Sequence, residues 1–199
     1  MDGIDFWFSI GSTYSYLTVM RLSAVEAAQG VAFDWRPFDV RSIMLEQDNI
    51  PFAKKPVKAA YMWRDIARRA AGYGLPARLP APYPLEDLAR ANRVALVGMR
   101  EGWGRDYVVE TYRIWFQVGQ PAGSEPNLGR SLHRIGQDPE RVTGLADAPE
   151  SKRALAQETE AAKAAGIFGS PSFVVGAEVF WGDDRLEDAI AWHRHGRLG

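Results

Sequence analysis

The sequence predicts an α/β protein in which a β-α-β unit and a β-β-α unit are separated by a large helical insertion. Short runs rich in aromatic and β-branched residues stand near both ends of the chain, and helix-forming residues dominate the long stretch between them. No internal repeat or low-complexity linker divides the chain. With 199 residues and 46% hydrophobic content, it is long enough for one core with a sizeable insertion.

The first unit is predicted to occupy residues 1–39. Residues 4–9 (IDFWFS) are dense in aromatic and β-branched side chains, which predicts a strand. Apolar residues at helical spacing follow from Thr13 and end near Gly30. Apolar and polar residues then alternate over 31–38, which predicts a second strand and completes a β-α-β unit.

The helical insertion is predicted to occupy residues 40–166, where Ala, Arg, Glu and Leu dominate. Apolar residues recur at three- and four-residue spacing in 61–74, 85–102 and 105–119, and a proline-rich loop spans 74–87. We interpret most of the aromatic residues here as core packing. A cluster of this kind could also wall an aromatic substrate.

Strand patterns return in the last unit, residues 167–199. Two short runs, 172–175 and 178–181, are separated by a Gly-Ala pair as in a tight hairpin, and a final helix is predicted from Asp183. Together with residues 1–39, this order is typical of a thioredoxin-like domain. The segment between the two parts forms the predicted helical insertion domain.

The charges of the chain argue against a polyanionic partner. The formal net charge is -1, from 24 basic and 25 acidic residues mixed along the chain, so no strong field would attract nucleic acid or an anionic membrane. Near the N-terminus, Asp2 and Asp5 stand where a secretory signal would carry basic residues, and no apolar run approaches the length of a membrane span. We therefore expect a cytoplasmic protein without nucleic-acid or membrane partners.

Cysteine is absent, which excludes disulfides, thiolate metal sites and a thiol nucleophile belonging to the protein. Any sulfur chemistry would have to use a bound thiol. The three histidines, His133, His193 and His195, are too few and too widely spread for a zinc site. No metal site is predicted.

Two serines stand three apart where the first helix is expected to begin. Ser12 and Ser15 follow the first strand directly, in the run Ser-Thr-Tyr-Ser. Backbone N–H groups and the positive end of the helix dipole stabilise an anion at such a corner, and they lower the pKa of a thiol placed there. The Ser12 hydroxyl could serve such an anion, or it could simply cap the helix, as serine often does.

Three segments carry a family resemblance: DFWFSIGSTYSYL (5–17), DNIPFAKKPVKAAYMWRDI (48–66) and GIFGSPSFVVGAEVFWGDDRLEDAI (166–190). In order and spacing they resemble the 2-hydroxychromene-2-carboxylate isomerases and the kappa-class glutathione transferases. Both groups have a DsbA-like thioredoxin fold with an inserted helical domain. The resemblance implies glutathione as cofactor and Ser12 as the catalytic residue that holds its thiolate.

The resemblance also implies cofactor-binding residues in the last unit. Ser170 would pair its backbone with the cysteinyl part of glutathione, next to a cis peptide bond at Pro171; a plain strand-initiating proline is the alternative. Asp183 and Asp184 would hold the γ-glutamyl end. Alternatively, both aspartates only cap the last helix.

Two more cofactor-binding residues are implied near the start of the insertion. Asn49 would contact glutathione or substrate, and Lys58 would pair with the glycyl carboxylate, unless it is an ordinary solvated lysine. The chain also departs from the family pattern, because Thr13 and Phe52 stand where prolines are usual and 117–127 replaces an acidic loop. These changes affect the expected pocket for the second substrate.

The resemblance implies a glutathione-dependent cis-trans isomerase of an aromatic hydroxy-acid, of the 2-hydroxychromene-2-carboxylate isomerase type, in aromatic compound degradation. Glutathione thiolate would add to the conjugated small aromatic substrate, the ring would open, the freed bond would rotate, and elimination would return glutathione. Relatives imply a homodimer. Two alternatives are a kappa-like transferase, which consumes thiol, and a non-catalytic glutathione-binding module, which binds the thiol without lowering its pKa.

Overall fold

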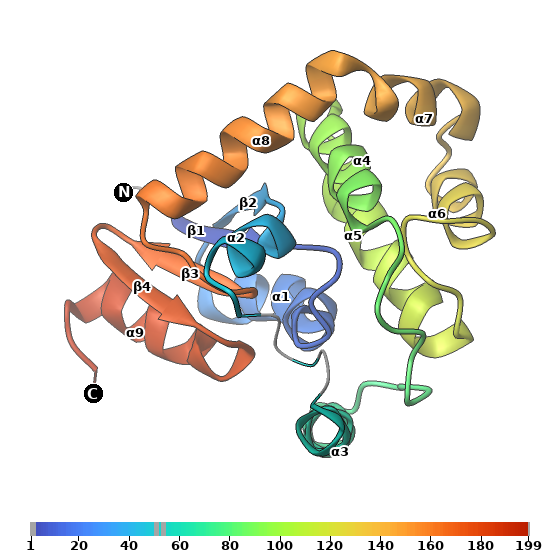
Figure 1. Cartoon of the computed structure of the whole chain (residues 1–199). Helices are drawn as coiled ribbons and strands as arrows, with labels where there is room; N and C mark the ends of the chain where they lie inside the picture. The colour runs from blue at the N-terminus through green and yellow to red at the C-terminus, as the bar shows by residue number, and fades with distance from the viewer. Residues whose placement is uncertain (1–2, 50–51, 53–54, 199) are drawn as a thin grey trace.

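The computed structural model describes residues 3–49, 52 and 55–198. The elements in chain order are β1 (Ile4–Phe8), α1 (Ser15–Gln29), β2 (Phe33–Pro37), α2 (Val40–Glu46), α3 (Pro56–Gly72), α4 (Leu88–Glu101), α5 (Gly104–Arg113), a π-helix (Ile114–Val118), α6 (Asn127–Arg134), α7 (Pro139–Asp147), α8 (Pro149–Ala164), β3 (Ser172–Val175), β4 (Glu178–Trp181), a 3₁₀ turn (Asp183–Arg185) and α9 (Leu186–His195) (Figure 1).

The four strands form one sheet in the order β2-β1-β3-β4. β1 runs parallel to β2 and antiparallel to β3, with Phe6 opposite both Trp35 and Phe173, and β4 returns antiparallel to β3. The parallel strands β1 and β2 are connected by the crossover helix α1, whereas the antiparallel strands β3 and β4 need only a tight turn. The predicted β-α-β and β-β-α units are confirmed.

Helices cover both faces of the sheet. Alternate side chains of β1 point to opposite faces, so β1 contributes to the packing on both sides. Ile4, Phe6 and Phe8 share a core with buried residues of α1 and α9. Trp7 points the other way and packs with Phe38 and with residues of α2 and α8. Within the described residues, no helix is both long and apolar enough to cross a bilayer.

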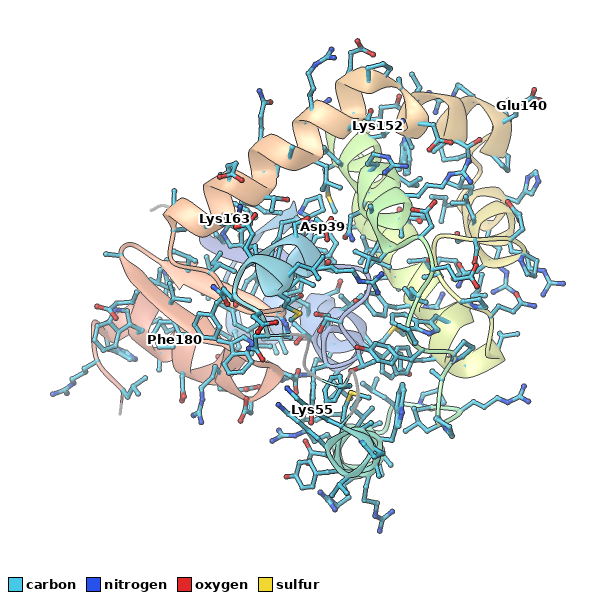
Figure 2. All side chains as sticks on the ribbon, viewed as in Figure 1. Asp39, Lys55, Glu140, Lys152, Lys163 and Phe180 are labelled. Carbon is cyan, nitrogen blue, oxygen red and sulfur yellow. The ribbon has the colours of Figure 1, made fainter. Side chains whose placement is uncertain are left out.

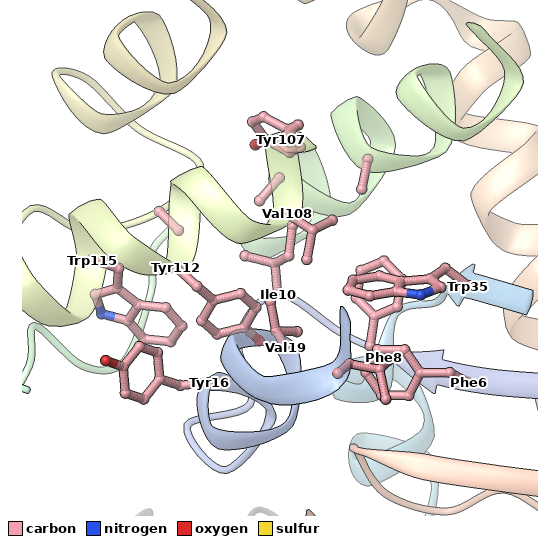
Figure 3. Close-up of a cluster of buried hydrophobic side chains, with 14 of the residues drawn as sticks. Phe6, Phe8, Ile10, Tyr16, Val19, Trp35, Tyr107, Val108, Tyr112 and Trp115 are labelled. Atoms are coloured by element: carbon pink, nitrogen blue, oxygen red, sulfur yellow. The ribbon is translucent and has the colours of Figure 1, made fainter. Parts of the chain in front are cut away.

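The helices of the insertion continue the same core over α1. Figure 3 shows Tyr112 and Trp115 lying beside Tyr16 of α1, and the rings of Tyr16 and Phe116 are stacked 4.2 Å apart. These four aromatic side chains are fully buried. The interpretation of the aromatic run as core packing is confirmed for Tyr112, Trp115 and Phe116.

Several element boundaries differ from the sequence predictions, among them the second strand, which was expected over 31–38 and occupies Phe33–Pro37. The first helix was expected from Thr13 and begins at Ser15, since the chain first makes a turn at the corner. The single helix expected over 105–119 changes to a π-helix at Ile114. The last helix was expected from Asp183, but it begins with a 3₁₀ turn and becomes α-helical at Leu186.

Candidate functional site

A tight turn joins β1 to α1 and carries Ser12. The Ser12 amide donates to the carbonyl of Ser9 at 3.0 Å. Gly11 adopts φ 147°, and a Cβ at this position would meet the Leu88 side chain at 3.2 Å. Because L-residues disfavour this φ, glycine suits the turn both in conformation and in space.

The Ser12 hydroxyl points across the corner to the chain before β3. It donates to the carbonyl oxygen of Ser170 at 2.6 Å, a favourable O–H···O distance. It also accepts from the Ser15 amide, but at 3.4 Å. The N-cap residue of α1, Tyr14, makes no side-chain cap bond. Capping is therefore the weaker of the two contacts that Ser12 makes.

The segment that faces Ser12 is fixed to the β1–α1 corner by the side chain of Ser170. The Ser170–Pro171 peptide is cis, as predicted, and both residues are buried. The hydroxyl of Ser170 accepts from the Ser9 amide at 2.8 Å and shares a hydrogen bond of 2.9 Å with the Ser15 hydroxyl. Serine side chains thus connect the β1–α1 corner to the loop before β3.

Asp183 is buried and fully engaged within the protein. One carboxylate oxygen accepts from Thr18 at 2.9 Å and from Arg21 at 3.2 Å, and the other accepts from the Tyr73 hydroxyl at 3.0 Å. Only 2% of Asp183 is exposed. This aspartate joins the last unit to α1 and to the end of α3.

Asp184 has different surroundings. Its side chain is 44% exposed and lies 3.7 Å from the Arg69 guanidinium and 3.8 Å from that of Arg185. A carboxylate and two guanidinium groups therefore meet at a solvent-accessible surface. Opposite charges in this arrangement can bind a zwitterion.

Helix α3 is anchored to the corner by polar contacts. The Tyr14 hydroxyl donates to Asp65 at 3.0 Å, Arg69 donates to the same carboxylate at 3.1 Å, and the Thr13 hydroxyl contacts the Met62 sulfur at 3.0 Å. Partial burial opposes ionisation of Asp65, but the hydrogen bonds from Tyr14 and Arg69 outweigh it and hold its pKa below the ordinary value. Burial, reinforced by this carboxylate, raises the pKa of Tyr14.

Asn49, which follows the end of α2, and Lys58, in the first turn of α3, are both exposed. The Asn49 amide donates to the Met44 carbonyl at 2.8 Å, just after α2 ends. The Lys58 ammonium stands 5.9 Å from the centre of the Phe52 ring. Within the described part of the chain, neither side chain contacts Ser12, so the structure does not bring these two residues together with the serines.

Two surface cavities lie away from Ser12. One, of about 300 Å³, lies between α2, α4 and α8, and Figure 2 labels three of its lining residues, Asp39, Lys152 and Lys163. Charged side chains that line it already have partners within the protein: Asp39 caps α2, and Lys163 contacts Glu46 and Glu160 at 2.6 and 2.8 Å. The other, of about 370 Å³, lies between α1 and α9.

Sequence reasoning missed two residues that contact the Ser12 turn. Asn92 of α4 and Tyr112 of α5 are both fully buried and hydrogen-bond to its backbone. Asn92 could have been noticed, because it is a polar residue among the apolar residues that α4 buries. Tyr112 stands in an aromatic run and carries no such sign.

The fold and the serine corner define a thioredoxin-like protein with hydroxyl groups, and no thiols, at the strand-to-helix corner. A model of the DSBA-like thioredoxin domain matches residues 3–190. The chain belongs to this family.

Relatives and solved structures narrow the likeness. The chain is 27% identical to a 2-hydroxychromene-2-carboxylate isomerase of Sphingobium xenophagum, over 92% of this chain and 94% of that protein. It is 23% identical to glutathione S-transferase kappa 2 of Caenorhabditis elegans, over 84% of this chain and 78% of that protein. The structure of a 2-hydroxychromene-2-carboxylate isomerase matches with a TM-score of 0.83 and 25% identity, covering 94% of this chain and 92% of that one.

Proposed function

We propose that this protein is a glutathione-dependent cis-trans isomerase of an aromatic hydroxy-acid, of the 2-hydroxychromene-2-carboxylate isomerase type, acting in the degradation of aromatic compounds. The observation that carries the proposal is the Ser12 hydroxyl, a hydrogen-bond donor at the start of α1 that faces the Ser170 carbonyl at 2.6 Å. Relatives named as isomerases over nine-tenths of the chain support the reaction class.

Glutathione fits the groups around this corner. Ser12 offers a hydroxyl to the sulfur, and the neighbouring backbone at Ser170 suits the peptide-like cysteinyl part. Asp184, with Arg69 and Arg185 beside it, offers both charges to the zwitterionic γ-glutamyl end. When bound, glutathione would supply the thiolate that adds to the conjugated substrate and later leaves it.

The protein's own part is to hold and orient. The Ser12 hydroxyl can turn from the Ser170 carbonyl toward a sulfur anion, and the positive end of the α1 dipole would add to the stabilisation of that anion. Asp183, whose carboxylate is already engaged, keeps the corner and α3 together. The Ser12 hydroxyl and the helix dipole would stabilise the charged sulfur more than the neutral one, which is the condition for lowering the pKa of the thiol.

The aromatic substrate would lie against rings that adjoin α1. Phe52 and Trp63 pack edge-on against Tyr83, with centroids 6.0 and 6.1 Å away, and Trp63 lies 6.4 Å from Phe116, which stacks on Tyr16. Phe52, Trp63 and Tyr83 are only partly buried. Partly exposed rings of this kind suit a flat apolar ligand.

The proposal is tested by following substrate and thiol together. Purified protein is incubated with 2-hydroxychromene-2-carboxylate, with and without glutathione, while substrate absorbance and free thiol are measured. We expect conversion only when glutathione is present, with free thiol unchanged at the end. Conversion that is independent of glutathione, or none in its presence although glutathione binds, would contradict the proposal.

A kappa-like glutathione transferase is the second candidate, favoured by the likeness to the kappa protein of Caenorhabditis elegans. It would consume free thiol in step with substrate, which the same assay detects. A non-catalytic binder would hold glutathione without shifting the pKa of its thiol.

We also propose that the protein is a cytoplasmic homodimer. Sedimentation of the purified protein tests whether it is a dimer.

A further inference from the structure

We propose that Asn92 and Tyr112 are positioning residues that hold the Ser9–Ser12 turn and so direct the Ser12 hydroxyl. The inference rests on the proposed function for the role of Ser12, but its contacts stand on their own. Both residues belong to the helical insertion, and neither is required to touch glutathione or substrate. The insertion would then form part of the support of the reactive corner as well as the wall of a substrate pocket.

The side-chain amide of Asn92 pairs with both backbone groups of Ile10. Its oxygen accepts from the Ile10 amide at 2.8 Å, and its nitrogen donates to the Ile10 carbonyl at 3.2 Å. The same nitrogen lies 2.8 Å from the Leu88 carbonyl, within α4, and 3.2 Å from the Ser9 hydroxyl. Asn92 thus binds the turn as a neighbouring strand would, at a point where none of the described strands pairs with Ile10.

The orientation of this amide follows from its partners. Reversing it would place the Asn92 nitrogen against the Ile10 amide, donor to donor, and its oxygen against two carbonyls. All of these groups are buried, so an unmatched one would cost about 1–3 kcal/mol. The network therefore tolerates one arrangement of Asn92.

Tyr112 binds the two ends of the same turn. Its hydroxyl lies 3.0 Å from the Ser9 carbonyl and 3.1 Å from the Ser12 carbonyl. Figure 3 shows the Tyr112 ring reaching from α5 to the turn beside Ile10. Burial raises the pKa of Tyr112, so its hydroxyl stays protonated and remains a donor at every physiological pH.

These contacts constrain the backbone from which the Ser12 side chain projects. The Ser12 amide donates to the Ser9 carbonyl, and the Ser12 carbonyl accepts from the Tyr112 hydroxyl. Ile10, which lies between Ser9 and Ser12 in the chain, is held by the Asn92 side chain. A catalytic group must be kept within roughly half an ångström of its working position. Loosening this turn should therefore weaken the hydrogen bond from Ser12 to a bound thiolate.

The test compares two Tyr→Phe variants in the same helix. Tyr112→Phe removes the hydroxyl that holds the turn. Tyr107→Phe is the matched control, because Tyr107 is equally buried and its hydroxyl has no hydrogen-bond partner within the described residues. Two quantities are measured for each full-length variant: hydrogen exchange at the Ile10 and Ser12 amides of the free protein, and the pKa of bound glutathione thiol from thiolate absorbance.

For Tyr112→Phe we expect exchange at these two amides to be about fivefold faster, as for one lost neutral hydrogen bond. We also expect the ratio of bound thiolate to bound neutral thiol at a fixed pH to fall about threefold, which is half a pKa unit. Tyr107→Phe should match the wild type in both measurements. Asn92→Leu, which removes the amide at similar volume, should act in the same direction as Tyr112→Phe.

The outcomes separate this inference from the proposed function. Unchanged exchange in Tyr112→Phe would overturn the positioning role whether or not glutathione binds. Faster exchange with an unchanged thiol pKa would overturn the link to Ser12 and leave the proposed function intact. A wild-type protein that fails to bind glutathione would sink the proposed function, and the exchange measurement would still decide whether Tyr112 holds the turn.

Discussion

The Ser12 hydroxyl makes two hydrogen bonds of unequal length, and the difference predicts what its removal does. The bond it donates to Ser170 is 2.6 Å, while the one it accepts from the Ser15 amide is 3.4 Å. Ser12→Ala should remove a charge-assisted bond to bound thiolate worth about 1.5–3 kcal/mol. The pKa of the bound thiol should then rise by about one to two units.

Thiolate absorbance against pH in both proteins measures this shift, and unfolding curves serve as the control. A role limited to capping would instead lower stability by about 1 kcal/mol and leave the titration of the bound thiol unchanged. Coincident titrations with a lower melting temperature would show that Ser12 is a cap.

Substitutions of the two neighbouring aspartates should affect different properties, the stability of the fold at Asp183 and glutathione binding at Asp184. Asp183 is 1% exposed at the side chain and paired with Arg21, so Asp183→Asn should cost about 3–5 kcal/mol, as for a broken buried ion pair. Asp184 is exposed, so Asp184→Asn should leave the melting temperature almost unchanged and weaken glutathione binding about tenfold, or 1.4 kcal/mol. Thermal unfolding and calorimetric titration of both variants check this pair. The same loss of affinity in both variants, corrected for folding, would contradict the division of roles.

Single residues of the site were predictable to different degrees. The family resemblance implies Ser12 and the Ser170–Pro171 pair as site residues, which local patterns alone would not do, and the structure brings Ser12 and Ser170 together. Sequence does not reveal that Tyr73, 110 positions away, engages the carboxylate of Asp183, and a contact between Asp183 and glutathione stays a prediction. Asn92 and Tyr112 reach the turn through packing between helices, which local patterns do not encode.

At the scale of elements, α3 is held to the corner by the Asp65 carboxylate. Because its folded pKa lies below the ordinary value, Asp65 binds fewer protons in the folded protein than in the unfolded one. Its stabilisation is therefore present above the unfolded value of 3.8 and is lost as the pH falls through the lower folded pKa.

Asp65→Asn should reduce stability at pH 7 by about 1 kcal/mol, since neutral hydrogen bonds replace charged ones. It should also flatten the acid limb of stability below about pH 5. Urea unfolding at a series of pH values checks both effects. Parallel curves for the two proteins through the acid range would show that Asp65 does not carry this dependence.

Elements with a regular pattern were predicted best. The hairpin strands have the predicted bounds, Ser172–Val175 and Glu178–Trp181, because side-chain alternation and a Gly-Ala turn define them locally. The change from α5 to the π-helix at Ile114 was not predicted. One extra residue per turn depends on how Trp115 and Phe116 pack against other elements, and their own spacing does not show it.

At the scale of the molecule, the thioredoxin-like unit and the helical insertion share one core. The cluster around Phe6 and Phe8 of the sheet continues through Tyr16 to Tyr112 and Trp115 of the insertion. The division into 1–39 plus 167–199 and 40–166 stays a proposal about architecture. A shared core predicts that the two parts unfold together.

We therefore expect one transition with the same midpoint by far-ultraviolet circular dichroism and by tryptophan fluorescence. A chain that joins 1–39 directly to 167–199 should fail to fold, because it exposes the α1 face that the insertion covers. Two separate transitions in the full chain, or a folded shortened chain, would contradict a common core.

The Ser170 carbonyl, which accepts from the Ser12 hydroxyl, would compete with a bound sulfur for that hydroxyl. A sulfur that bears a negative charge offers the hydroxyl a stronger partner than a neutral carbonyl, whereas an uncharged sulfur does not. Ser12 would therefore exchange partners according to the charge state of the ligand. When the sulfur is neutral the Ser170 carbonyl would accept the hydroxyl again, so a neutral thiol would bind less tightly than a thiolate.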